Sequence, residues 1–160
     1  MIKLLDILLQ ENDEESILIP RRSPEERTKN YLIATNRKIQ QYIKDGGKGD
    51  LDLSNTPITS LPSNLTVGGY LDLYNSKITS LPSNLTVGGG LDLRNTPIIS
   101  LPSNLKVGGS LYLSNTPIIS LPSDLKVGGD LYLYNTPLSK SHTKEQIKQR
   151  VPGVKGNIYL

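Results

Sequence analysis

The apolar positions of this chain recur with a period of 20 residues over the range 51–138. The first unit begins at Leu51 and reads LDLSNTPITSLPSNLTVGGY. The later units begin at Leu71, Leu91, Leu111 and Leu131. One unit has too few apolar side chains to offset the entropy lost when its residues become ordered. Stacked units share a core and a backbone hydrogen-bond ladder, so the period predicts a solenoid.

Each unit combines a strand signal with turn signals. Leu51 and Leu53 alternate with polar residues, which places both leucines toward the core and residues 50, 52 and 54 on the opposite face. Leu-Pro pairs, such as the one at Leu61, argue against a helix on the return side, because proline removes a backbone donor and restricts its predecessor. We therefore expect an α/β solenoid with one parallel β-sheet of about six short strands and an extended or turn-rich convex side.

An asparagine recurs two positions after the second leucine of every unit. Its short amide can hydrogen-bond backbone groups, so we expect it to stabilise the turn that leaves each strand. The residues are Asn55, Asn75, Asn95, Asn115 and Asn135.

Two segments precede the repeats. Residues 1–22 form an amphipathic stretch followed by an acidic linker, and its apolar face could dock on the rest of the chain or mediate assembly. Residues 23–50 predict a capping helix that starts at Ser23, with Glu26 completing a capping box, and ends at the glycine pair 46–47. Leu32, Ile39 and Ile43 are spaced to line one face of this helix, with Tyr31 and Tyr42 beside it.

Residues 139–160 replace the usual return side with a helical capping repeat. Thr143 and Gln146 predict a second capping box, and Ile147 and Val151 share a helix face. The final residues match the Val-Gly-Gly-x-Leu-x-Leu step of the repeats, so they predict a sixth strand at Ile158. A polar helix on the last coil is typical of a solenoid cap.

The pattern LxLxNxxIxxLPxxLxVGGxLxL resembles a leucine-rich repeat of the short bacterial and viral type, over residues 47–160. The order of leader, helix and coils is also similar to proteins encoded by bacteriophages. The resemblance implies a parallel sheet on a concave side and ligand binding there, usually to protein. For a phage-encoded chain, the partner would be a host protein or another phage protein. The Val-Gly-Gly-x step departs from the commonest repeat by inserting a turn before the strand.

Composition and charge narrow the classes of function. The 160 residues include no cysteine, which excludes disulfides and thiolate zinc sites. The net charge of +3 is concentrated at the C-terminal end, where residues 131–160 carry five basic side chains and one acidic side chain. Lys140, Lys144 and Lys148 form a basic stripe that we interpret as a solvated helix face, so nucleic-acid binding is not expected. The N-terminal apolar run is interrupted by Asp6, and we expect no signal peptide, no membrane span and a cytoplasmic monomer.

The outward strand positions form columns that suggest a binding surface. The central column has an acidic half (Asp52, Asp72 and Asp92) and an aromatic half (Tyr112, Tyr132 and Tyr159). Flanking columns add Asp50, Tyr70 and Asp130 on one side and Tyr74, Arg94 and Tyr134 on the other. Aligned carboxylates repel one another, so stability alone does not favour the acidic half. Either the aspartates are simply soluble residues relieved by Arg94, or they contact a basic partner. Likewise, the tyrosines either stabilise the sheet by stacking or supply binding hot spots.

No catalytic, metal or cofactor site is predicted. The only histidine, His142, lies in the C-terminal connection, and an open sheet offers no pocket that would raise the pKa of an aspartate. Carboxylates spaced along a rigid sheet also make a poor cage for a cation. We therefore expect a non-catalytic module that binds a protein through the strand face. Two alternatives stay open: a structural protein that assembles through its ends, and a carbohydrate-binding module.

Overall fold

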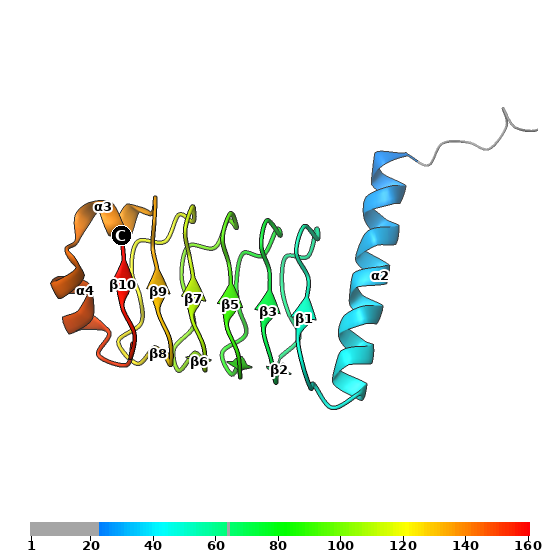
Figure 1. The fold of residues 1–160 in the computed structure, drawn as a ribbon. Helices are drawn as coiled ribbons and strands as arrows, with labels where there is room; N and C mark the ends of the chain where they lie inside the picture. The colour runs from blue at the N-terminus through cyan, green and yellow to red at the C-terminus, as the bar shows by residue number, and fades with distance from the viewer. Residues whose placement is uncertain (1–22, 64) are drawn as a thin grey trace, which may run out of the picture. The chain divides into compact units, whose positions relative to one another are not determined.

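The computed structural model describes residues 23–63 and 65–160, and the predicted amphipathic segment within 1–22 lies outside them. The chain divides into two units, Met1–Asn30 and Tyr31–Leu160. Of the first unit, only the start of helix α2 (Pro24–Lys44) is described. The second unit holds the rest of α2 and all of the strands (Figure 1). Within the described residues, no helix is both long enough and apolar enough to cross a membrane.

Helix α2 begins at the predicted residue because side chains cap its first turn. The Glu26 N–H donates to Ser23 Oγ at 3.1 Å, and the Ser23 N–H donates to Glu26 Oε2 at 2.9 Å. This capping box satisfies an N–H group that has no acceptor inside the helix. The helix ends at Lys44, and Gly46 and Gly47 follow with φ values of 85° and 65°. The predicted start and end of the helix are confirmed.

The face of α2 that packs on the core differs from the predicted face. Ile39 is buried as expected, but Leu32 is only half-buried and Ile43 is 42% exposed. Tyr42 packs against the core, as expected for a residue beside this face, and Thr35, which was not expected there, is buried. Positions 35, 39 and 42 also share one side of a helix, and contact with the first coil decides which side is buried. The expected role of Ile43 is therefore wrong.

The strand that opens each coil joins a six-stranded parallel sheet. Its members are β1 (Leu51–Asp52), β3 (Leu71–Asp72), β5 (Leu91–Asp92), β7 (Leu111–Tyr112), β9 (Leu131–Tyr132) and β10 (Ile158–Tyr159), in that spatial order. Equivalent residues pair in register, from Leu51 with Leu71 to Leu131 with Ile158. The coils thus form a parallel-strand β-solenoid, and the predicted parallel sheet is confirmed (Figure 1).

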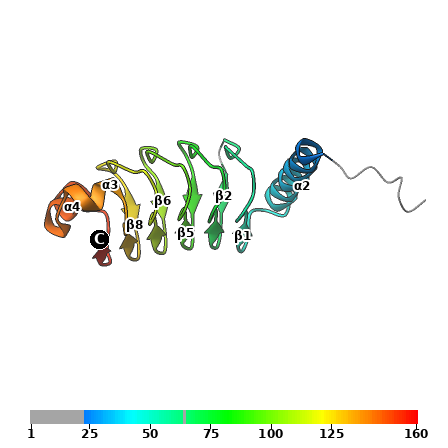
Figure 2. The ribbon, with the colours of Figure 1, turned by 90° about the horizontal axis from the view of Figure 1, so that it is seen from above.

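A second parallel sheet runs along another side of the coils, so the expectation of a single sheet is wrong. It consists of β2 (Thr66–Val67), β4 (Thr86–Val87), β6 (Lys106–Val107) and β8 (Lys126–Val127). The glycines that follow these strands allow the close approach of neighbouring coils. A Cβ atom on Gly108 would lie only 2.1 Å from Gly88 O. Because glycine has no Cβ atom, the backbones of neighbouring coils can approach closely enough to form the hydrogen bonds of this sheet. Figure 2 shows the coils side by side.

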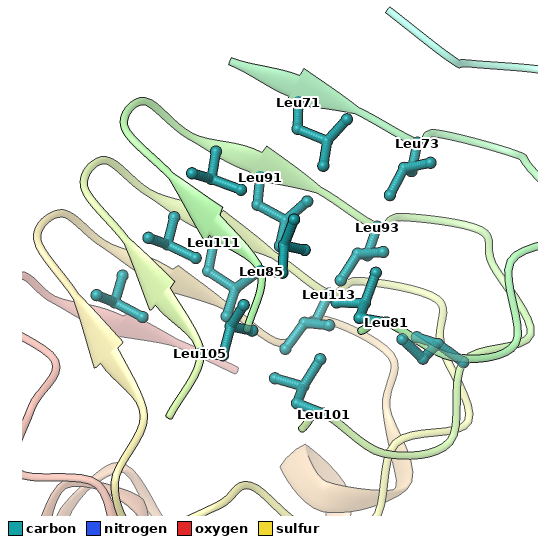
Figure 3. Packing of buried hydrophobic residues seen from close by; sticks show 14 of the residues in the cluster. Leu71, Leu73, Leu81, Leu85, Leu91, Leu93, Leu101, Leu105, Leu111 and Leu113 are labelled. Carbon is teal, nitrogen blue, oxygen red and sulfur yellow. The ribbon is translucent and has the colours of Figure 1, made fainter. Parts of the chain in front are cut away.

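Leucines from the two sides of each coil fill the core in rows. Leu71, Leu91 and Leu111 form one such row, and each is fully buried (Figure 3). The next row, one pleat further along the strands, contains the equally buried Leu73 and Leu93 (Figure 3). Every coil therefore completes its core with side chains of the coils on either side, as expected for a solenoid.

The turns that leave β1, β5, β7 and β9 use two residues in different ways, whereas the buried Ser76 hydroxyl after β3 bonds no described residue. Thr56 is buried and its hydroxyl donates to Leu53 O at 2.6 Å, and Thr96, Thr116 and Thr136 repeat this bond. The recurring asparagine before it is exposed and has a positive φ, 55° at Asn55, which asparagine tolerates better than most residues. Two pairs of these amides bond between neighbouring coils: Asn75 Nδ2 donates to Asn55 Oδ1 at 2.8 Å, and Asn135 Nδ2 donates to Asn115 Oδ1 at 2.9 Å. The predicted bond from asparagine to the backbone is therefore wrong, and threonine has that role.

The last coil is helical, as predicted. Thr143 caps α4 (Lys144–Arg150) through a capping box with Gln146, and β10 closes the six-stranded sheet. A short helix that the sequence analysis missed, α3 (Pro137–Ser141), precedes α4 and is capped by Thr136.

A lysine from a helix substitutes for a missing coil at each end of the repeats. Lys38 of α2 donates from Nζ to Asp52 O of β1. Lys148 of α4 donates from Nζ to Val154 O, and Gly156 O lies 3.5 Å from the same nitrogen. Carbonyl groups that an adjacent coil would otherwise bind are thereby satisfied, which blunts the exposed edges.

Candidate functional site

The central outward column forms one continuous row across the six-stranded sheet. Asp52 pairs in register with Asp72, Asp72 with Asp92, and Asp92 with Tyr112. Tyr132 and Tyr159 continue the row through their pairings with the preceding strands. The structure therefore brings the two predicted halves together on one face, and the strand face consists of this column and the two flanking columns.

All three aspartates of the acidic half form the same local hydrogen bond. Oδ1 of each accepts the backbone N–H two residues later: Ser54 for Asp52 at 2.9 Å, Tyr74 for Asp72 at 2.8 Å and Arg94 for Asp92 at 2.9 Å. The carboxylates thus stabilise the chain where it leaves the strand, a role in which aspartate is favoured. The acidic half therefore has a structural explanation that the sequence analysis did not find.

Asp92 is buried, which contradicts the expectation that the acidic half is exposed. Its residue exposure is 1%. Arg94 approaches it with Nε 2.9 Å and Nη2 2.5 Å from Oδ2, and the Tyr70 hydroxyl donates to Oδ2 at 3.3 Å. The hydrogen bond to Asp92 raises the pKa of Arg94, so the guanidinium group stays protonated. Asp92 therefore acts within the face by positioning Arg94, and a partner cannot contact it directly.

The other two aspartates differ in their electrostatic setting. Backbone hydrogen bonding by the Ser54 N–H lowers the pKa of Asp52, and this residue is exposed. Partial burial raises the pKa of Asp72, and the neighbouring carboxylates of Asp92 and Asp52 raise it further against the bond from Tyr74. The predicted repulsion between neighbouring carboxylates therefore contributes to the raised pKa of Asp72.

Tyr70 reaches Asp92 by crossing a glycine. Gly90 occupies the position beside Tyr70 in the next coil, and a Cβ atom there would lie 2.8 Å from the Tyr70 ring. The ring therefore lies against the bare backbone of Gly90. Burial raises the pKa of Tyr70, and the Asp92 carboxylate raises it further. Gly90 is a residue that the sequence analysis missed. The other positions of its flanking column, which includes Tyr70, hold residues with side chains, so a glycine there was a visible signal.

The aromatic half is a stack of rings. Tyr112 and Tyr132 are parallel within 8°, with centroids 4.8 Å apart, and Tyr132 and Tyr159 are parallel within 8° at 4.7 Å. Tyr134 lies tilted beside the stack, 6.4 Å from both Tyr132 and Tyr159. Tyr70 approaches the other end, with its centroid 6.5 Å from that of Tyr112. The spacing of the stack follows the spacing of the strands, so the sheet itself sets the stacking distance.

A cation covers each outer ring of this stack. The Arg94 guanidinium lies 5.4 Å from the Tyr112 centroid and 5.5 Å from that of Tyr74. Lys144 Nζ of α4 lies 5.9 Å from the Tyr159 centroid. Both distances fall within the range of cation–π attraction. Lys144 was predicted only as part of a basic stripe, and its place beside the aromatic half follows from the position of α4.

The phenol groups differ in whether they are already hydrogen-bonded. The hydroxyls of Tyr70 and Tyr132 contact Asp92 and Asp130, the second at 3.4 Å. Four other hydroxyls on this face form no hydrogen bond with any described residue: those of Tyr74, Tyr112, Tyr134 and Tyr159. Tyr74 is 36% exposed and Tyr134 is 47% exposed. This part of the face therefore offers apolar rings together with hydrogen-bonding groups that have no protein partner in residues 23–63 and 65–160.

Other candidate chemistry lies away from this face. His142 Nδ1 lies 2.8 Å from Ser141 Oγ at the end of α3, and that hydroxyl also lies 3.0 Å from Pro137 O within the same helix. Among the residues that the structure describes, no group of three or more His, Cys, Asp or Glu side chains could hold a metal ion. Comparison of the chain with protein-family models, curated proteins and solved structures found no match.

Proposed function

We propose that the chain is a non-catalytic module that recognises a partner protein through the strand face, with the aromatic half as the main contact area. The observation that carries this proposal is that Tyr112 and Tyr159 are held in place by stacking on Tyr132, while their hydroxyls bond no described residue. Tyrosine is favoured at binding hot spots because it supplies a large rigid area and a polar tip at low entropic cost. Rings that are ordered before binding lower that cost further.

Each predicted site residue has a place in this proposal. Tyr74, Tyr112, Tyr134 and Tyr159 contact the partner, while Tyr70 and Tyr132 hold the arrangement together through their carboxylate contacts. Arg94 lies between two rings with 45% of its side chain exposed, so it can reach a partner carboxylate or carbonyl. Oδ2 of Asp52 and Oδ2 of Asp72 accept no hydrogen bond from a described residue and can contact a cationic group, whereas Asp92 contributes only by holding Arg94.

We also propose that the coils are leucine-rich repeats of the short type. Buried leucine rows and parallel strands on one side of each coil support this interpretation. The second sheet and the exposed asparagine depart from the repeat pattern on which the resemblance rests. If the chain is phage-encoded, a host or phage protein is its partner.

Two tyrosines with equal exposure allow a direct test. Tyr134 on the strand face and Tyr31 on α2 are each 47% exposed. Immobilised wild type, a Tyr74→Ala/Tyr134→Ala variant and a Tyr31→Ala variant should be used to capture proteins from the native cell. We expect the wild type and Tyr31→Ala to retain the same proteins and the double variant to lose them. Identical proteins on all three would contradict binding through the strand face.

The carbohydrate alternative receives less support from the ring geometry. Sugars bind aromatic side chains through the ring faces, but the faces of Tyr112, Tyr132 and Tyr159 cover one another or lie beside Arg94 and Lys144. Retention on a glycan array that is lost with Asp72→Ala would favour this alternative. The assembly alternative depends partly on residues 1–22 and predicts that removing them abolishes a concentration-dependent increase in mass.

A further inference from the structure

A groove with a volume of about 660 Å³ lies between α4 and β10, at the end of the six-stranded sheet. Its helix side carries Lys144, Glu145 and Lys148, and its strand side carries Lys155, Asn157 and Ile158. A volume of this size falls in the range of ligand-binding sites. The groove lies at the end of the strand face. Asn157, which continues the column of Tyr70 and Asp130, and Lys144, which lies near the Tyr159 ring, border both.

The strand side of the groove is an open sheet edge. Elsewhere in the sheet each coil donates two leucine N–H groups to the next coil, for example Leu131 to Asn157 O at 2.9 Å and Leu133 to Tyr159 O at 2.8 Å. The equivalent donors of the last coil are the N–H groups of Ile158 and Leu160. Neither donates to any described residue. An edge of this kind is a template for pairing with another extended chain.

In contrast, backbone carbonyls of the last coil beside the four-stranded sheet already have a hydrogen-bond partner. Lys148 Nζ donates to Val154 O there and lies 3.5 Å from Gly156 O. In the preceding coils the equivalent carbonyls accept glycine N–H groups, such as Gly128 N–H to Val107 O at 2.9 Å. Lys148 thus occupies the place of a following strand beside the four-stranded sheet, and it leaves the edge beside β10 open.

The charge of the groove indicates the chemistry of its occupant. Lys144 and Lys155 are exposed, and neither forms an ion pair with a described residue. Among the described residues that line the groove, Glu145 alone is acidic. Two ammonium groups beside two unused backbone donors attract carboxylates and carbonyls.

We propose that this groove binds an extended acidic segment of a partner protein, which adds as a strand beside β10. The segment accepts hydrogen bonds from the N–H groups of Ile158 and Leu160, and its carboxylates bind Lys144 and Lys155. Main-chain pairing then supplies affinity and the lysines supply selectivity for acidic sequence. This site is additional to the strand face and does not require the proposed function to be correct.

A defined peptide tests the proposal with the full chain. The probe is a fluorescein-labelled decapeptide of alternating Glu and Val, which presents carboxylates on one side when extended. We expect fluorescence anisotropy to report binding that weakens about tenfold or more in Lys144→Glu/Lys155→Glu. The matched control is Lys106→Glu/Lys126→Glu, which changes the net charge equally on the four-stranded sheet and should leave binding within about twofold of wild type.

A second probe separates strand pairing from simple charge attraction. The same peptide with alternate backbone nitrogens methylated keeps its carboxylates but is hindered from lying beside a strand, and we expect about tenfold weaker binding. Bound unmodified peptide should also slow hydrogen exchange at the Ile158 and Leu160 amides. Equal binding of both peptides, equal loss in both lysine variants, or no binding at about 1 mM peptide would each overturn the proposal. Tyr134→Ala should leave peptide binding unchanged, which separates this site from the strand face.

Discussion

The acidic and aromatic halves of the strand face lie on the same sheet, yet they are stabilised in different ways. Every aspartate of the acidic half bonds a backbone N–H of its own chain, and Asp92 is buried beneath Arg94 and Tyr70. In the aromatic half, ring stacking holds the side chains, and the hydroxyls of Tyr112 and Tyr159 bond no described residue. The difference teaches that the carboxylates of the acidic half are largely used by the fold, whereas the described fold does not use the hydroxyls of Tyr112 and Tyr159.

Removal of Asp92 should have the largest effect on stability. Asp92→Ala leaves the Arg94 N–H and the Tyr70 hydroxyl without their acceptor and removes a buried ion-pair partner, so we expect a loss of about 2–4 kcal/mol. Asp52→Ala removes the same kind of local bond at an exposed position and should cost less than about 1 kcal/mol. Urea unfolding at pH 7 measures both. Equal losses would contradict a special role for Asp92.

Loss of a central ring should have the next largest effect. Tyr132 stacks on Tyr112 and Tyr159, so Tyr132→Ala removes two ring contacts and should cost about 1–3 kcal/mol. Tyr132→Phe keeps both contacts and should stay within about 0.5 kcal/mol of wild type. Thermal unfolding of the two variants checks this pair. A similar loss in both would mean that the hydroxyl, rather than the stack, stabilises the aromatic half.

Deletion of single hydroxyls compares the two halves directly. Tyr70→Phe removes the bond to buried Asp92 and should cost about 1 kcal/mol. Tyr112→Phe removes a hydroxyl that bonds no described residue and should be neutral within about 0.3 kcal/mol. Urea midpoints of the two variants test the difference. In the partner-capture assay the order should reverse, with Tyr112→Phe the more harmful.

Neutralisation of Asp72 should have the smallest effect, and it should be stabilising. Because the pKa of Asp72 in the folded chain lies above the ordinary value of 3.8, folding favours the protonated form. The ionised carboxylate therefore lowers stability at neutral pH, and this penalty disappears as the pH falls through the raised pKa toward 3.8. Asp72→Asn keeps an acceptor for the Tyr74 N–H and should gain a few tenths of a kcal/mol at pH 7.

That gain should vanish when unfolding is repeated at about pH 3, where Asp72 is protonated in both states. Asp52 provides the opposite sign, since its pKa is lowered in the folded chain. Asp52→Asn should therefore be slightly destabilising at pH 7, with a difference that is lost as the pH falls below the ordinary aspartate range. A gain for Asp52→Asn would contradict the stated origin of its pKa shift.

Much of the site could be predicted because a fixed period places equivalent residues in rows. The column from Asp52 to Tyr159 follows from counting alone, once the strands are known to be parallel and in register. Burial of Asp92 could not be predicted in this way, because it depends on Tyr70 crossing the bare backbone of Gly90. The position of Lys144 over Tyr159 likewise depends on how α4 packs beside β10.

The sequence by itself determined the coil, the first sheet and the capped helix starts. These features depend on residues close in the chain: Leu-x-Leu alternation, the Ser23 and Thr143 caps, and the glycine pairs. Only the tertiary structure decided the second sheet, the buried side of α2 and the lysines at the coil ends. Each of these depends on backbone groups brought together from different coils, as where Lys148 satisfies carbonyls of residues 154 and 156. The contacts of α2 and of the lysines at the coil ends leave no periodic signal, because they occur where the repeat is interrupted.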